Sequence, residues 1–123
     1  MEERINLAEK LATFDDRWSP RIVGTMNDCK LCVVKVEGEF VWHQHEETDD
    51  FFLVTRGHLF IDLREGDRER TVELGPGELF VVPRGVEHRP RADVETHLLL
   101  IEPVGTVNTG DAGGPLSAPE TTL

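Results

Sequence analysis

The feature that most constrains the fold is the regular spacing of turn residues. After Pro20, short apolar segments are separated by glycine, proline or acidic turn residues about every eight residues. Such spacing is typical of strands in a β-sandwich or β-barrel. Helical patterns do not alternate with these segments, so a parallel α/β sheet is not expected. We therefore predict an all-β fold. The expected strands are 21–25, 30–38, 40–45, 51–57, 58–66, 70–75, 78–85, 86–91 and 95–103.

The two ends of the chain have a different texture. Residues 5–13 place apolar side chains at helical spacing, and Asn6 followed by Glu9 resembles a capping box, so one short helix is predicted there. From Val104 onward small residues, glycine and proline dominate, which is typical of an extended or flexible tail. The predicted organisation is an N-terminal helical arm (1–18), a barrel (19–103) and an extended or flexible C-terminal tail (104–123).

Charge and hydropathy narrow the classes of partner. The chain has 24 acidic against 13 basic residues, a formal net charge of −11, which argues against nucleic acid and anionic membrane surfaces as partners. No apolar run approaches the ~20 residues that a membrane-spanning helix needs. The first residues are too polar and acidic for a secretory signal, so a cytoplasmic location is expected.

Cys29 and Cys32 form a C-x-x-C pair, a spacing found in redox centres and zinc sites. The segment reads as a strand, in which side chains three apart point to opposite faces. A second C-x-x-C is missing from the sequence, and no helix follows to lower a thiol pKa. The two cysteines are therefore predicted to be small core or surface residues.

Three histidines and one acid form the most informative pattern. His43 and His45 lie two residues apart in an expected strand, so both imidazoles should project from one face. Asp50 begins the next expected strand after a short polar loop, and His88 follows a pair of tight turns. On adjoining strands these side chains would form a nitrogen and oxygen ligand set suited to Fe(II), Mn(II), Ni(II), Cu(II) or Zn(II).

Both segments resemble the two motifs of the cupin superfamily. The order and spacing of two motifs together are far more specific than either motif alone. The spacing from Gly38 to His43 is one residue shorter than in the usual form. The resemblance covers about residues 20–103. Within the superfamily, the sequence of these segments is most similar to small single-domain cupins described as mannose-6-phosphate isomerase-like. The matching residues are Gly38, His43, His45, Asp50 and Gly57 in the first motif, and Gly77, Pro83, Gly85 and His88 in the second.

The chain departs from the cupin motifs at two positions. Asp50 stands where Glu is usual, and its side chain is one methylene shorter. Either its strand lies closer to the metal, or the three histidines bind alone, or Asp49 or Glu47 takes the role of the carboxylate. Ala92 stands where the second motif usually ends in Asn, a change that removes no ligand.

The resemblance implies a double-stranded β-helix, or jelly-roll barrel, with one divalent transition metal ion held by His43, His45, Asp50 and His88. It implies a metal-dependent enzyme acting on a small molecule, with dioxygenase-like and isomerase-like chemistry both open. The alternative is a non-catalytic module that binds a small molecule. His58 matches no ligand position, and His97 matches none either.

The alternation of side chains also predicts how the chain assembles. If the two motif histidines face inward from a strand, then Phe40, Trp42 and Gln44 face outward, and Phe51 and Leu53 do so on the next strand. The resulting apolar patch must be covered, because a soluble monomer usually avoids one. The N-terminal helix or a second subunit would cover it, and we predict a homodimer.

Overall fold

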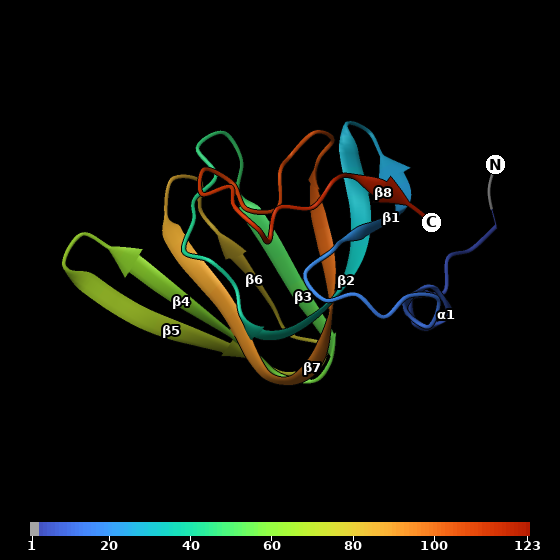
Figure 1. Cartoon of the computed structure of the whole chain (residues 1–123), viewed down its shortest axis with the longest axis horizontal. Coiled ribbons are helices and arrows are strands. Elements are labelled where there is room, and N and C mark those ends of the chain that lie inside the picture. The colour runs from blue at the N-terminus through green and yellow to red at the C-terminus, as the bar shows by residue number, and fades with distance from the viewer. Residues whose placement is uncertain (1–2) are drawn as a thin grey trace.

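The computed structural model describes residues 3–123 and consists of one bent, unclosed sheet of eight strands with a single short helix (Figure 1). The main path of the sheet runs β5-β4-β7-β2-β1-β8, and β3 pairs with both β6 and β7. The fold is the all-β jelly roll expected from the sequence. The strands are β1 (Arg21–Met26), β2 (Cys29–Glu39), β3 (Asp50–Arg56), β4 (Leu59–Glu65), β5 (Arg68–Leu74), β6 (Leu79–Val82), β7 (Glu87–Pro103) and β8 (Thr121–Thr122).

The longest strand, β7, replaces two strands expected at 86–91 and 95–103. The three residues between them, Ala-Asp-Val at 92–94, include no glycine or proline, so nothing interrupts the extended backbone. The first part of β7 pairs with β4 and the last part with β2, so this strand joins the two halves of the bent sheet. Prediction of a strand at 40–45 was also wrong: this segment has only an isolated bridge between His43 and His88.

Helix α1 (Leu7–Leu11) begins at Asn6, whose side chain accepts a hydrogen bond from the Glu9 backbone N–H at 3.0 Å. This is half of the capping arrangement expected from the sequence. The helix places Leu11 against Val33 on the outer side of the sheet. No helix in the part of the chain described, 3–123, is long and apolar enough to cross a membrane. The cytoplasmic location stays a prediction.

The main core lies on the inner side of the bent sheet. Val54, Leu59 and Ile61 are fully buried there, with side chains from all the long strands around them. Cys32 belongs to this core, and burial, with the nearby charge of Glu102, raises the pKa of its thiol to about 12. Cys32 is therefore an unreactive core residue, one of the two placements predicted for it.

The C-terminal segment after β7 packs back onto the sheet and runs across its upper end in Figure 1. Thr109 is fully buried, and the Asn108 amide donates hydrogen bonds to the backbone oxygens of Trp18 and Leu116. Strand β8 then pairs in parallel with β1. The small residues of the C-terminal segment therefore form turns that contact the sheet, a packing that the composition of the segment did not indicate. The division into arm, barrel and tail stays a prediction.

Candidate metal centre

Four buried side chains, all singled out from the sequence, converge inside the sheet. His43 and His45 come from the segment between β2 and β3, Asp50 opens β3, and His88 lies near the start of β7. One potential ligand atom from each residue lies within 4.8 Å of all the others. Two atoms bound on opposite sides of one ion lie about 4.0–4.4 Å apart, since metal–nitrogen and metal–oxygen bonds are about 2.0–2.2 Å long, so small shifts of these side chains would let a single ion contact all four groups.

The segment that carries the first two histidines contains an irregularity that inverts the expected alternation. The Phe40 N–H donates to the Pro90 oxygen at 2.9 Å, whereas His43 and His88 exchange backbone hydrogen bonds of 3.0 and 2.9 Å. Between these two contacts the segment advances by three residues, from Phe40 to His43, whereas β7 spans only two, from Pro90 to His88, as in a β-bulge. As a result Phe40 and His43 both point inward, with their rings 5.4 Å apart. The prediction that Phe40 faces outward was wrong.

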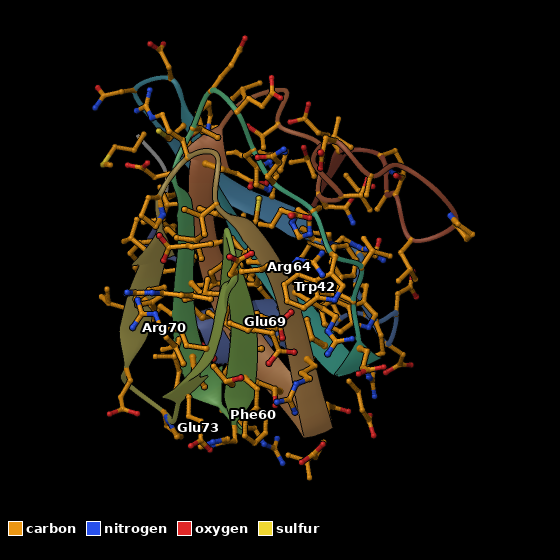
Figure 2. The ribbon with its side chains drawn as sticks, turned by 90° about the vertical axis from the view of Figure 1, so that its left-hand side faces the viewer. Trp42, Phe60, Arg64, Glu69, Arg70 and Glu73 are labelled. Carbon is orange, nitrogen blue, oxygen red and sulfur yellow. The ribbon has the colours of Figure 1, made fainter. Side chains whose placement is uncertain are left out.

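Trp42 does face outward, and it packs against charged side chains. The Arg64 guanidinium lies 4.1 Å from the centre of the indole ring and that of Arg89 lies 5.2 Å away. Figure 2 shows Trp42 beside Arg64 on this face of the sheet. Cation–π contacts therefore cover the Trp42 ring, which was expected to lie in an exposed apolar patch.

Backbone carbonyl groups fix the orientation of two imidazoles. Nδ1 of His43 lies 2.9 Å from the Val41 oxygen, and Nδ1 of His88 lies 2.9 Å from the Val86 oxygen. Each Nδ1–H donates to its carbonyl, so each Nε2 is left to face the centre. Metal-binding histidines are commonly oriented by such a second hydrogen bond.

The position of His88 tests whether the site suits a cation. Its ring is 1% exposed, and while Nδ1 faces the Val86 oxygen, Nε2 lies 2.9 Å from Asp50 Oδ2. Two oxygen acceptors therefore flank one buried imidazole. A proton or a metal ion must lie between Nε2 and Asp50, because two lone pairs facing each other would repel. The residues present fit a divalent transition metal.

The ionisation of two of the four groups, His43 and Asp50, also suits metal binding. Burial, reinforced by the neighbouring His88, lowers the pKa of His43 to about 4. Burial opposes ionisation of Asp50, but hydrogen bonds from His45 and His88 hold the pKa of this carboxyl well below its usual range. For His45, burial is outweighed by the hydrogen bond and charge of Asp50, and its pKa is raised. Near neutral pH the centre therefore contains a neutral His43 and an ionised Asp50, the forms in which these groups bind metals.

The other candidate residues lie outside the group. Asp49 Oδ1 accepts a hydrogen bond from the Arg84 backbone N–H at 2.9 Å, and Glu47 lies on the loop without belonging to the cluster. His58 pairs with Glu73 on the surface, and Nε2 of His97 lies 2.7 Å from Glu95. The shorter side chain of Asp50 reaches His45 and His88, at 3.3 and 2.9 Å, because β3 begins at that residue, directly beside them.

A small cavity of about 40 Å³ adjoins the centre and is walled mainly by apolar side chains, among them Phe52, Leu98 and Leu100. A wider groove of about 570 Å³ lies between the 44–48 and 103–111 loops. His45 lines both spaces, so the groove leads towards the candidate metal position. A cavity of about 40 Å³ holds one or two small molecules of the size of water or O₂, whereas drug-sized ligands need hundreds of Å³.

Sequence reasoning missed one residue of this site, Glu102. Its side chain lines the cavity, is 5% exposed, and lies 3.5 Å from Nζ of Lys30. Burial, with the charge of Asp50 adding to it, raises the pKa of Glu102 to about 7. The signal in the sequence is an acid that shares the alternation of Leu98 and Leu100 in an otherwise apolar strand.

A comparison with known protein families gives the same result as the two sequence motifs and the fold. Residues 30–102 match the family model described as a cupin domain. The chain belongs to the cupin family. Since the match extends from early in β2 to the end of β7, it includes all four residues of the candidate centre.

Relatives of this cupin include both characterised and uncharacterised proteins. It is 31% identical over 80 residues to the uncharacterised protein YdbB of Bacillus subtilis, covering 65% of this chain and 68% of that protein. It is 32% identical over 69 residues to acireductone dioxygenase 1 of Coprinopsis cinerea, covering 54% of this chain but only 38% of that protein. A cupin-2 domain protein from Shewanella frigidimarina has a solved structure with 45% identity and a TM-score of 0.76, covering 80% of this chain and 93% of that one.

Proposed function

We propose that this cupin is a metal-dependent enzyme that acts on a small molecule, with one divalent transition metal ion held by His43, His45, Asp50 and His88. The observation that carries the proposal is the arrangement around His88, where a buried ring is fixed by one oxygen and faces the Asp50 carboxylate with its other nitrogen. Such a site is costly to bury for structural purposes alone, since each polar group needs a partner.

Among metal-dependent reactions we favour a dioxygenase-like activity over an isomerase-like one. The apolar cavity beside the ligand set has the size of a diatomic gas, and the wider groove has room for an organic substrate. Similarity to acireductone dioxygenase 1 points the same way, although the chain spans only 38% of that protein. A bound metal would supply Lewis-acid or oxygen-activating chemistry. The chain itself would orient the ligands through Val41 and Val86 and exclude bulk water with its apolar walls.

Metal analysis tests the ligand set. The purified parent chain, reconstituted with zinc and then desalted, is expected to retain one ion per chain, and the His45→Ala variant is expected to lose most of it. The matched control is His58→Ala, which removes a surface histidine paired with Glu73. Equal retention by the parent and His45→Ala would overturn the proposal.

Oxygen consumption tests the reaction type. The iron(II)-loaded chain is expected to consume O₂ when supplied with a panel of small diols, enediols and thiols, and the zinc-loaded chain is expected to consume none. Retention of metal with no O₂ uptake for any panel member, together with tight binding of one of them, would instead support the non-catalytic binding module.

We also propose that the chain forms a homodimer through the outer face of β3 and β6. On this face Phe51 pairs with Val81 and Leu53 with Leu79. Leu79 is 53% exposed and Val81 42%, although both are large apolar residues. Helix α1 lies over β2, on the neighbouring part of the sheet, so it does not account for these two side chains. A second copy would remove them from water, which is favourable by about 25 cal/mol for each Å² of apolar surface.

A further inference from the structure

Apart from the proposed ligand histidines, the ionisable side chains that line the cavity and the groove are all acidic. The groove contains the carboxylates of Glu46, Glu47 and Asp111, and the cavity contains Glu102 in addition to the ligand Asp50. Within residues 3–123, none of the side chains lining either space belongs to a lysine or arginine. A ligand that entered this site would therefore meet carboxylates on its way to the metal.

The lysine beside Glu102, Lys30, is not available to a ligand. Lys30 is 4% exposed, and its Nζ donates hydrogen bonds to the Thr106 oxygen at 3.0 Å and to Glu120 at 3.1 Å. The same atom lies 3.5 Å from Glu102 Oε1. One lysine thus faces two carboxylates and leaves an excess of negative charge. Because Lys30 is absent from the lining of the cavity, it cannot serve as an anchor for a phosphate or a carboxylate there.

Glu102 has the most direct influence on a bound ligand. It lies at the end of β7 that continues into the 103–111 loop, and it is the carboxylate in the cavity lining that the proposed metal set does not use. The rest of that lining is mostly apolar, so the negative charge that Glu102 carries when it is ionised, above a pKa of about 7, is poorly screened there. A second anion in this space would be repelled, whereas a hydroxyl or ammonium group could donate a hydrogen bond.

We infer that the ligand of this centre is a compact molecule that is neutral or positively charged outside the atoms that bind the metal, and that Glu102 sets this preference. The inference rests on the proposed function, because it requires a ligand that reaches the metal. It excludes sugar phosphates and carboxylated sugars as substrates, since their anionic groups would find no cation.

Three probes that differ mainly in charge test the inference. Catechol, 3,4-dihydroxybenzoate and dopamine carry the same pair of adjacent hydroxyl groups for the metal and are neutral, anionic and cationic elsewhere. Their affinities for the zinc-loaded full-length chain are measured by calorimetry without oxygen, so no turnover is needed. We expect the parent to bind 3,4-dihydroxybenzoate at least about tenfold more weakly than catechol, a factor that corresponds to about 1.4 kcal/mol. Dopamine should bind at least as tightly as catechol.

Variants assign the effect to a residue. Glu102→Gln keeps the size of the side chain and should reduce the gap between the neutral and anionic probes to about threefold or less. Glu120→Gln is the matched control. It removes a carboxylate that pairs with the same lysine, Lys30, and Glu120 lines neither the cavity nor the groove. It should preserve the gap, and both variants should retain zinc and unfold at temperatures close to that of the parent.

The outcomes separate the two proposals. If the parent does not retain zinc, the proposed function fails. If it retains zinc but binds the anionic probe as tightly as catechol, or binds none of the probes, only the inference about the ligand is overturned. If the gap persists in Glu102→Gln and closes when Glu46 and Glu47 are both replaced by glutamine, the rim of the groove excludes anions and the role of Glu102 is wrong.

Discussion

Replacement of Gly110 by alanine should disturb the candidate metal centre from the C-terminal segment. Gly110 has a φ of +55°, and a Cβ atom there would lie 2.3 Å from the backbone oxygen of Gln44 and 3.1 Å from Cδ2 of His43. The first distance is far below any normal contact, and its partner is a backbone atom between two proposed ligands. The 107–111 turn must therefore move away from the segment that carries His43 and His45.

Gly113 supplies a matched control for the backbone effect. Its φ is +62°, but a Cβ atom there would meet nothing within 4 Å. Both alanine variants place a side chain in the left-handed region, at a cost of roughly 1–2 kcal/mol. Only Gly110→Ala also strains the hydrogen bonds between Gln44 and Asp111, in which Asp111 N–H donates to the Gln44 oxygen and Gln44 N–H donates to Asp111 Oδ1.

The difference between the two variants measures the clash. Loss of two hydrogen bonds at the surface amounts to about 1–2 kcal/mol in the free energy of unfolding. For a domain of this size that corresponds to a difference in Tm of roughly 4–8 °C. Displacement of groups that support metal ligands commonly weakens metal affinity by about 10–100-fold, and we expect at least tenfold for Gly110→Ala.

Two measurements check this prediction. Thermal unfolding of the metal-free chains gives the Tm difference, and competition with a fluorescent chelator gives the zinc affinity of the parent and both variants. Equal Tm values and equal zinc affinities for Gly110→Ala and Gly113→Ala would refute the reasoning, because the C-terminal segment would then not press against the metal-binding segment.

The other predictions concern the carboxylate ligand, pH and assembly. Asp50→Asn should weaken zinc affinity at least about tenfold in the same competition assay, whereas Asp49→Asn should leave it within threefold; the reverse order would exclude Asp50. Because the pKa of His43 falls from 6.5 to about 4 on folding, the unfolded chain binds more protons between these pH values. The free energy of unfolding of the metal-free chain should therefore decrease as pH falls through this window. Urea titrations at several pH values should show a weaker pH dependence of this free energy for His43→Asn than for the parent. An equal pH dependence in the two chains would contradict the lowered pKa of His43. Light scattering should give about twice the 13.9 kDa of one chain, and Leu79→Asp should shift the mass to that of a monomer while Val104→Asp does not; a monomeric parent would end the homodimer proposal.

Much of the candidate site could be predicted because its information is local. Two histidines separated by one residue share a face in any extended backbone, and this holds for His43 and His45 although their segment is not a regular strand. Asp50 was identified by the spacing to Gly57 that the first cupin motif requires, and His88 by its place in the second motif after two tight turns. These relations depend on a few bonds along the chain, so the sequence contains them directly.

Other features depend on which segments pair, and the sequence alone does not specify that. Phe40 turns inward because three residues of its segment advance against two of β7, a mismatch that exists only once the strands have met. Glu102 lines the cavity because the C-terminal end of β7 passes the candidate ligands. The segment around Gly110 packs on Gln44 through contacts between residues about 65 positions apart.

The sequence by itself determined the all-β class and the positions of most strands, since alternation and turn chemistry act over a few residues. Its resemblance to the two cupin motifs identified the four residues of the candidate metal centre. Tertiary structure decided the single long strand β7, the inward position of Phe40, the role of Glu102 in the cavity and the packing of the C-terminal segment. Those features result from contacts between residues distant in the chain, where burial and hydrogen bonding across strands outweigh local preference.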